Sequence, residues 1–350
     1  MSEAPVCASD QQMEMYNSHI YTCALFFNMF IGFTSIILIV FAIRKLLVES
    51  IINVSTRMFL ILGLLCCTLH QTAYIVLRVQ VIYQIFFKLD QPCKLYYKAY
   101  DCKYVTFSLV AGNTGMIFIQ SAMTIDRILV TAFTKLWPKL KYWPGVILSG
   151  FMVSQEKQQR RQISIFQIGC NYTNVQLIFW NDPLTDYVPT CGQFPPNSVA
   201  RFQKFLEIAL YMSIAHMIIN VIILYINVVQ NRRQSQTFDV NERYQSRETL
   251  KSTQAIFFLS IVPILCLPSL YNFHKTLSPK YQHSLTPLQA GLALALSLCE
   301  TTPYACVAIP SLILFTLCYI RNQRHRKYKC IEITDRNWRR VYEKNTEDME

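Results

Sequence analysis

The sequence has 350 residues, of which 52% are hydrophobic and only 15% are charged. Soluble domains contain roughly 25% charged residues, and several uncharged runs here reach the length of about 20 residues that crosses a bilayer. A soluble globular fold and a disordered chain are therefore excluded, and an all-α membrane protein is expected. The basic residues behind the net charge of +12 lie between the apolar runs, so nucleic acid is not an expected partner.

Seven apolar runs predict a bundle of seven transmembrane helices. In chain order they are Ile20–Ile43, Met58–Leu77, Tyr104–Ile125, a broken run from Tyr142, Leu206–Val229, Ala255–Phe273 and a long run within Leu288–Ile320. Each intact run can cross about 30 Å of hydrocarbon at about 1.5 Å per residue. The predicted organisation is an extracellular N-terminus of residues 1–19, a transmembrane domain of residues 20–320 and a basic cytoplasmic tail of residues 321–350.

The distribution of Lys and Arg predicts the orientation of this bundle. With the N-terminus outside, the cytoplasmic loops and the proximal tail carry 20 of these residues, and the outer segments carry nine. Cytoplasmic segments are enriched in Lys and Arg, so the count favours an extracellular N-terminus and a cytoplasmic C-terminus. That orientation requires an odd number of crossings.

The fourth span is interrupted. Its first apolar run, residues 142–153, has 12 residues, which rise only about 18 Å and are too short to cross. Removing residues 153–167 would join Met152 to Ile168 and leave 24 uncharged residues. The ends of that segment can be encoded by splice-site sequences, so it is either a retained intron or gene-model error, or a genuine insertion. Asn171 begins an Asn-Tyr-Thr sequon, which would be glycosylated only if this region faces the lumen.

Four cysteines are expected on the outer side, namely Cys7, Cys93, Cys102 and Cys191. The oxidising compartment there favours disulfides, and a Cys102–Cys191 bond would tie an outer loop over the start of the third span. Cys7 and Cys93 would then form a second pair. Four cysteines allow three connectivities, and free thiols remain an alternative for some of them.

An acidic and a basic residue, Asp126 and Arg127, stand together at the inner end of the third span. Such a pair can hold itself in a resting state and release its Arg to a cytoplasmic partner when helices move. Arg127 follows Cys102 by 25 residues, or about 37 Å along a helix, which is enough to cross the membrane. The alternative is a simple positive-inside anchor with an acid at the helix end.

Together these features resemble a known receptor family. The segments that carry the resemblance are Cys7-Ala8-Ser9, Tyr100-x-Cys102-Lys103, GNTGMIFIQSAMTIDR from Gly112 to Arg127, Tyr187-Val188-Pro189-Thr190-Cys191 and Ile309-Pro310-Ser311-Leu312. They are similar to nematode serpentine chemoreceptors of class alpha, the Sra family of seven-transmembrane G-protein-coupled receptors. The similarity runs from Cys7 to about Arg326 and is interrupted by residues 153–167.

The resemblance implies a plasma-membrane receptor in sensory neurons that binds a small-molecule ligand and activates a heterotrimeric G protein. Only the role of Asp126 and Arg127 in G-protein coupling and the bridge from Cys102 carry over by residue. The sixth span reads SIVPILCLPSLY, without a Trp-containing CWxP motif, and the seventh contains AIPSLILF in place of NPxxY. Activation steps that depend on those two motifs are therefore not expected to apply.

Polar residues within the apolar runs are candidates for ligand contact, because such residues are expensive in a bilayer. Glu300 is the carboxylate deepest in a span and would either be neutral or pair with His216 or His70. Asn113 and Gln120 share one face of the third span. For each of them, hydrogen bonding that packs helices together is an equally good interpretation. The cysteines show no spacing typical of a metal site, and no metal or cofactor is expected.

Two other classes of membrane protein are weaker interpretations. A transporter or ligand-gated channel is the alternative function, but it predicts inverted repeats, paired broken helices or several midplane charges, and the sequence has none of these. An enzyme would need a nucleophile beside a base, or a metal cluster, and neither occurs at a credible spacing. The sequence is therefore interpreted as a receptor and not as an enzyme.

Overall fold

The computed structural model describes residues 7–8, 10–48, 54–133, 178–179, 182, 187–188, 190–192, 196–234, 240–276 and 303–322. The interrupted fourth span, the segment 153–167, the sequon at Asn171, Glu300 and the basic tail lie outside the described residues.

Six described helices are long and apolar enough to cross a membrane. They are α2 (His19–Val48), α3 (Val54–Phe87), α4 (Lys103–Ala132), α7 (Pro196–Gln234), α8 (Val240–Thr276) and the helix Pro303–Asn322. They coincide with the first, second, third, fifth, sixth and seventh predicted runs, so the helical nature of these six is confirmed. The last of them lies in the second half of the long run that was expected within Leu288–Ile320, and the first half of that run lies outside the described residues.

The helices extend well beyond the apolar runs. α7 begins at Pro196 and α8 at Val240, ahead of the expected starts at Leu206 and Ala255. Hydropathy marks only the part of a helix that lies in hydrocarbon, whereas backbone hydrogen bonding continues into polar surroundings. Five residues, 235–239, separate α7 from α8. The cations expected in that loop therefore belong to helices; these are Arg232, Arg233, Arg243, Arg247 and Lys251.

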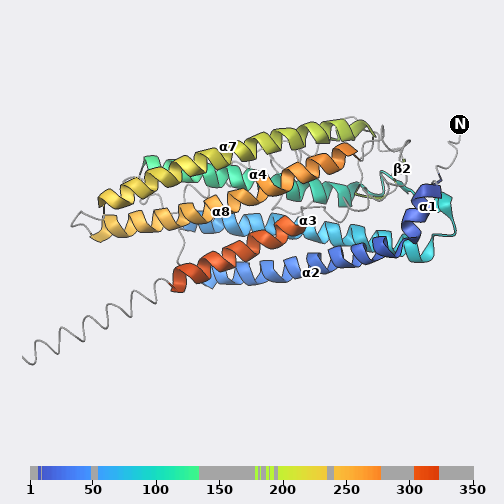
Figure 1. Cartoon of the computed structure of the whole chain (residues 1–350), viewed down its shortest axis with the longest axis horizontal. Coiled ribbons are helices and arrows are strands. Elements are labelled where there is room, and N and C mark those ends of the chain that lie inside the picture. The colour runs from blue at the N-terminus through green and yellow to red at the C-terminus, as the bar shows by residue number, and fades with distance from the viewer. Residues whose placement is uncertain are drawn as a thin grey trace, which may run out of the picture.

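The helices pack side by side along the long axis of the molecule (Figure 1). α3 packs against α2 and α4, and α7 packs against α4 and α8. The Pro303–Asn322 helix lies beside α2, where Ser35 Oγ donates a hydrogen bond of 2.8 Å to the carbonyl oxygen of Cys306. The largest hydrophobic cluster gathers side chains of α2, α3, α4, α8 and this helix. One shared core therefore holds five of the six spans.

The close approach of α3 and α4 depends on a residue without a side chain. Gly112 of α4 is buried, and a Cβ atom there would lie 2.6 Å from His70 Cβ and 3.0 Å from the Cys66 carbonyl oxygen. Such distances leave no space for even a methyl group. Gly112 therefore sets the spacing between the two helices at this level.

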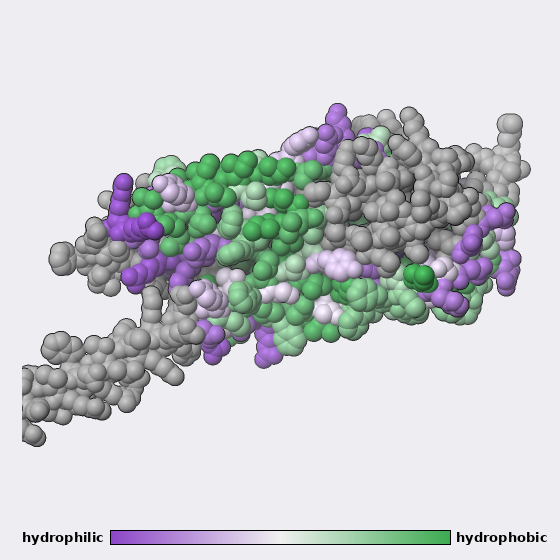
Figure 2. All heavy atoms as spheres, viewed as in Figure 1, coloured by the Kyte–Doolittle hydropathy of each residue, from purple (hydrophilic) through white to green (hydrophobic). Residues whose placement is uncertain are grey.

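Apolar side chains cover the outside of the bundle as well as its core. Hydrophobic residues occupy the middle of the visible face, and hydrophilic residues gather toward the ends (Figure 2). The aromatic side chains Phe27, Phe30 and Phe33 of α2 are exposed. An apolar belt between polar ends is the surface that a bilayer solvates.

Both disulfides lie at one end of the bundle, called the disulfide end below. It also holds the short helix α1 (Asp10–Asn17), the 3₁₀ turn η1 (Pro92–Lys94), and the strands β1 (Tyr97–Lys98) and β2 (Tyr187–Val188), which pair antiparallel. Figure 1 shows α1 and β2 together at this end. The sequence did not predict α1. Arg78, one of the nine Lys and Arg residues that the sequence places in outer segments, lies instead within α3 and is 7% exposed.

Candidate functional site: a buried Asp-Arg latch and two disulfides

The end of the bundle opposite the disulfides, called the Arg127 end, contains a buried ion pair. Arg127 and Asp126 lie near the end of α4 and are 1% and 0% exposed. Both Nε and Nη2 of Arg127 donate to Oδ2 of Asp126, with a distance of 3.2 Å from Nε. The two charges compensate each other, as a pair withdrawn from water requires.

The first turn of α3 completes this arrangement. Ser55 Oγ donates a hydrogen bond of 2.9 Å to Oδ1 of Asp126, and Nη2 of Arg127 donates one of 2.7 Å to Oγ1 of Thr56. Each member of the ion pair is thus bound to a hydroxyl of a second helix. These four residues, Ser55, Thr56, Asp126 and Arg127, are called the Arg127 latch below.

Sequence reasoning identified only half of the latch. Asp126 and Arg127 are an obvious acid-base pair, but Ser55 and Thr56 are two ordinary hydroxyl residues just before an apolar run. Such residues are common at helix starts. Their spacing in the chain carries no signal of the pairing across 71 residues that the structure reveals.

Two further polar contacts tie α4 to α7 and α8 near the same end. Thr131 Oγ1 donates to Oδ1 of Asn227 at 3.3 Å, and Nδ2 of Asn227 donates to Oγ1 of Thr253 at 3.0 Å. Asn227 of α7 is therefore shared between α4 and α8. Farther from this end, Nδ2 of Asn220 lies 3.4 Å from Oγ1 of Thr124.

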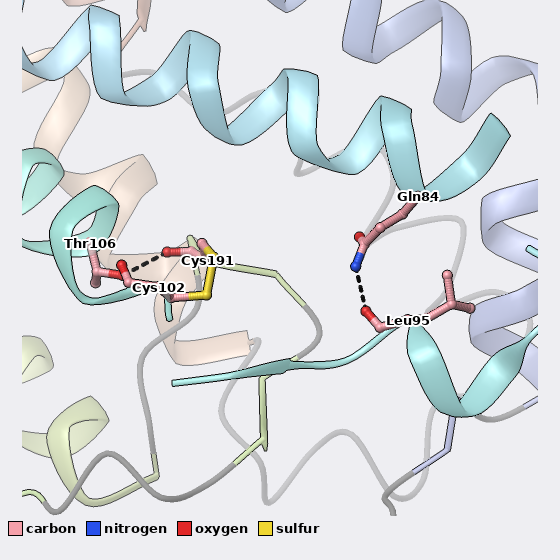
Figure 3. The surroundings of a disulfide bond; sticks show 5 residues. All are labelled: Gln84, Leu95, Cys102, Thr106 and Cys191. Carbon is pink, nitrogen blue, oxygen red and sulfur yellow. Dashed lines mark hydrogen bonds between the residues drawn. A yellow bond between two sulfur atoms is a disulfide. The ribbon is translucent and has the colours of Figure 1, made fainter. Parts of the chain in front are cut away.

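The disulfide end is bonded as Cys102–Cys191 and Cys7–Cys93, which selects one of the three possible connectivities. Figure 3 shows Cys191 beside the first turn of α4, where Thr106 Oγ1 donates a hydrogen bond of 2.8 Å to the Cys191 carbonyl oxygen. The bond from Cys102 joins this turn to the segment after β2. In the same view, Gln84 of α3 points toward the carbonyl oxygen of Leu95 and donates to it. The segment between α3 and α4 is thus held at Leu95, near its middle, and at Cys102, where it joins α4.

The second disulfide attaches the N-terminal segment to the turn η1. Besides the Cys7–Cys93 bond, the backbone N–H of Ala8 donates to the carbonyl oxygen of Pro92 at 3.0 Å. Tyr16 of α1 is 3% exposed and packs in a hydrophobic cluster with Tyr21 at the start of α2. Burial raises the pKa of the Tyr16 phenol well above its usual value, so the phenol stays protonated in alkaline solution.

The intramembrane candidates occupy different environments. Gln120 of α4 is 4% exposed, and among the described residues neither its Nε2 nor its Oε1 has a hydrogen-bond partner. Nδ1 of His216 on α7 is likewise buried without a partner, while Asn113 is half-buried on α4. Nδ1 of His70 lies 3.2 Å from the carbonyl oxygen of Leu109, and the predicted pairing of His70 or His216 with Glu300 lies outside the described residues. Among the described residues, no group of three or more His, Cys, Asp or Glu side chains is arranged to hold a metal.

Comparisons with known proteins agree with this architecture. The family model described as "Serpentine type 7TM GPCR chemoreceptor Sra" matches residues 2–339. Serpentine receptor class alpha-11 of Caenorhabditis briggsae is 73% identical over 94% of this chain and 93% of its own length. Class alpha-11 of Caenorhabditis elegans is 68% identical over 92% and 91%, and class alpha-13 of the same species is 34% identical over 91% and 89%.

The family model matches nearly the whole chain, and the six long apolar helices are those of a multi-pass plasma-membrane receptor. Serpentine chemoreceptors are receptors and not enzymes. The chain therefore belongs to the Sra family of seven-transmembrane G-protein-coupled chemoreceptors.

Proposed function

We propose that this protein is a chemosensory receptor that binds a small-molecule ligand and activates a heterotrimeric G protein at its Arg127 end. The observation that carries the proposal is the Arg127 latch, a buried ion pair held by hydroxyls of a neighbouring span. A purely structural anchor would be served by an Arg that reaches the membrane surface. An Arg that is buried and hydrogen-bonded to both Asp126 and Thr56 instead fits a resting state from which the Arg can be released.

Two features support an outward-facing disulfide end. Disulfides persist in oxidising surroundings, which the extracellular side supplies. Basic residues such as Arg232 and Arg233 lie in the last turn of α7, toward the Arg127 end, and cytoplasmic segments are enriched in such residues. We therefore take the Arg127 end as cytoplasmic and the N-terminus as extracellular.

Activation would be a shift between two helix arrangements. A ligand that binds better to the open arrangement increases its population. In that arrangement the inner ends of α4, α7 and α8 move apart and expose Arg127 to the G protein. Asn227 links these three helices in the closed arrangement, so its contacts with Thr131 and Thr253 must rearrange.

The ligand site is expected within the bundle. Its candidate contacts are Asn113, Gln120, His216 and Glu300, since polar groups in a membrane interior are costly unless they have a role. The family implies a chemical stimulus and the membrane of a sensory neuron. The alternative of a transporter or ligand-gated channel has no specific support in the described residues.

The test measures nucleotide exchange on purified heterotrimeric G proteins with receptor-containing membranes and without added ligand. Thr56→Val removes the hydroxyl acceptor of Arg127 on α3 and leaves Asp126 in place. We therefore expect exchange to rise about three- to tenfold above wild type, the effect of about 1 kcal/mol on the closed state. Arg127→Ala should reduce exchange to the level of receptor-free membranes. Thr72→Val is the matched control, because Thr72 is exposed and its hydroxyl donates to the Thr68 carbonyl oxygen within α3.

The proposal is wrong if Thr56→Val, expressed at the surface, leaves exchange at the receptor-free level with every G-protein class. Current through patches that carry the receptor, evoked by a chemical stimulus without G protein, would support the channel instead.

A further inference from the structure

A row of polar atoms without partners lies along the contact between α4 and α7. Gln120 Nε2 and Oε1, Ser213 Oγ, His216 Nδ1 and Asn220 Oδ1 are all buried and make no hydrogen bond within the part of the chain that the structure describes. Gln120 is 4% exposed, and Ser213 and Asn220 are 0% exposed. Native proteins satisfy nearly all such atoms, so a group of them requires an explanation.

The register between the two helices brings these residues to one line. Thr124 pairs with Asn220 and Thr131 pairs with Asn227, and both pairs are separated by 96 residues. Equal separations mean that α4 and α7 run parallel at this contact. The same offset sets Gln120 level with His216, one turn farther from the Arg127 end.

Ser213 belongs to the same line. It precedes Asn220 by seven residues, or about two turns, and therefore shares its face of α7. Gln120, Ser213, His216 and Asn220 are called the α4–α7 seam below.

The seam is free of ionised carboxylates and cations along both helices. α4 has no Asp, Glu, Lys or Arg between Lys103 and Asp126, and α7 has none between Glu207 and Arg232. A charged guest would lose its hydration without gaining a counter-charge. Glutamine and serine each offer a donor and an acceptor, and a neutral imidazole does so as well. The chemistry of the seam thus matches a neutral group that both donates and accepts hydrogen bonds.

We propose that the α4–α7 seam binds a neutral hydrogen-bonding group, a hydroxyl above all, supplied either by bound water or by an uncharged alcohol-type ligand. As a ligand site, the seam rests on the proposed receptor function and specifies its ligand class. Asn220, the seam residue closest to the Arg127 end, is hydrogen-bonded to Thr124, and Asp126 follows Thr124 by two residues. A molecule bound in the seam is therefore positioned to affect the Arg127 latch.

The first measurement tests whether the protein leaves the Gln120 amide without hydrogen-bond partners of its own. Thermal unfolding in lipid nanodiscs is followed with a thiol-reactive dye, because Cys66, Cys67 and Cys306 are free and buried until the helices separate. Gln120→Leu keeps a similar volume and removes two unpartnered polar atoms, so we expect Tm to rise by about 2–4 °C. The control is Thr114→Val, since Thr114 is buried on the same helix but bonded to Val110 O. That variant should not raise Tm.

The second measurement identifies the source of the guest. Cyclohexanol, methylcyclohexane, cyclohexanecarboxylate and cyclohexylammonium share one apolar ring and differ in their polar group. A rise in Tm with cyclohexanol that exceeds that with the other three, and that Gln120→Leu abolishes, identifies an alcohol-type ligand. Equal responses to all four probes, with Gln120→Leu still raising Tm, identify bound water as the occupant.

The inference is overturned if Gln120→Leu lowers Tm by as much as Thr114→Val, because protein groups then already satisfy Gln120. It is also overturned if the carboxylate or the ammonium probe gives the largest rise. Neither readout involves a G protein. Failure of the seam is thus distinct from failure of the proposed coupling, which nucleotide exchange on the same membranes reports.

Discussion

The ion pair of Asp126 and Arg127 illustrates how burial changes the consequence of a single substitution. Both side chains are withdrawn from solvent, and each is bonded to a hydroxyl of α3. In an exposed pair the loss of one charge costs little. In this buried pair the loss of one charge leaves the other charge in a low-dielectric interior without a counter-ion.

We expect Asp126→Asn to destabilise the folded protein by about 3–5 kcal/mol, since Arg127 would keep its charge without a counter-ion. Thermal unfolding in nanodiscs and the amount of receptor at the cell surface should both fall. Asp101→Asn is the control, because Asp101 is exposed near the disulfide end. Equal losses from the two variants would show that burial of Asp126 is not the cause.

A second prediction at this scale concerns the contact of α3 with α4. Gly112→Ala would bring a methyl group to 2.6 Å from His70 Cβ, and overpacking of this kind costs about 1–3 kcal/mol. Gly63→Ala is the matched variant, because its Cβ would meet Ile119 Cγ2 at an ordinary 3.6 Å. Thermal unfolding should therefore separate the two glycines. A Gly112→Ala protein as stable as Gly63→Ala would mean that the helices are farther apart than described.

Among the elements, α1 depends most on contacts outside itself. Eight residues are too few for an isolated helix to be stable in water. The Cys7–Cys93 bond and the burial of Tyr16 against Tyr21 hold it to the ends of α2 and α3. α1 therefore forms a cap at the disulfide end, and its helical structure depends on tertiary contacts.

Cys7→Ser should release this cap while the bundle stays folded. A disulfide that closes a loop of this length contributes about 2–5 kcal/mol, so the amides of α1 should exchange with solvent at least about tenfold faster. Hydrogen exchange followed by mass spectrometry measures this directly, with α3 as an internal reference. Cys23→Ser is the control, since Cys23 is a free and exposed thiol of α2. Unchanged exchange in α1 would assign its stability to packing alone.

The spans themselves were predictable because hydropathy is a local property. Runs such as Met58–Leu77 contain enough apolar residues to require a bilayer whatever surrounds them. The ends of α7 and α8 were not predictable from hydropathy, because polar residues outside the hydrocarbon continue the helices. Capping residues would be the only local signal of those ends.

At the scale of the whole molecule, the decisive quantity is the number of crossings. Six described helices can span a membrane, and the excess of Lys and Arg on one side, 20 against nine, favours termini on opposite sides. Opposite sides require a seventh crossing, which the sequence assigns to the region after Tyr142.

Epitope tags at the two termini test this topology in intact cells. The N-terminal tag should bind antibody without permeabilisation, and the C-terminal tag only after it. Deleting residues 153–167 should leave that pattern unchanged, because the joined run of 24 uncharged residues can still cross. A C-terminal tag exposed on intact cells would instead indicate an even number of crossings.

The sequence by itself determined the membrane class, six of the spans, the four cysteines that form disulfides and the Asp126-Arg127 pair, because each is a matter of composition or of neighbouring residues. Only the tertiary structure decided that Cys7 bonds to Cys93, that Ser55 and Thr56 hold the ion pair, and that Gln120 stands level with His216. Those contacts depend on how the helices are turned and aligned against one another. Packing between distant segments fixes that alignment, and no local pattern in the chain encodes it.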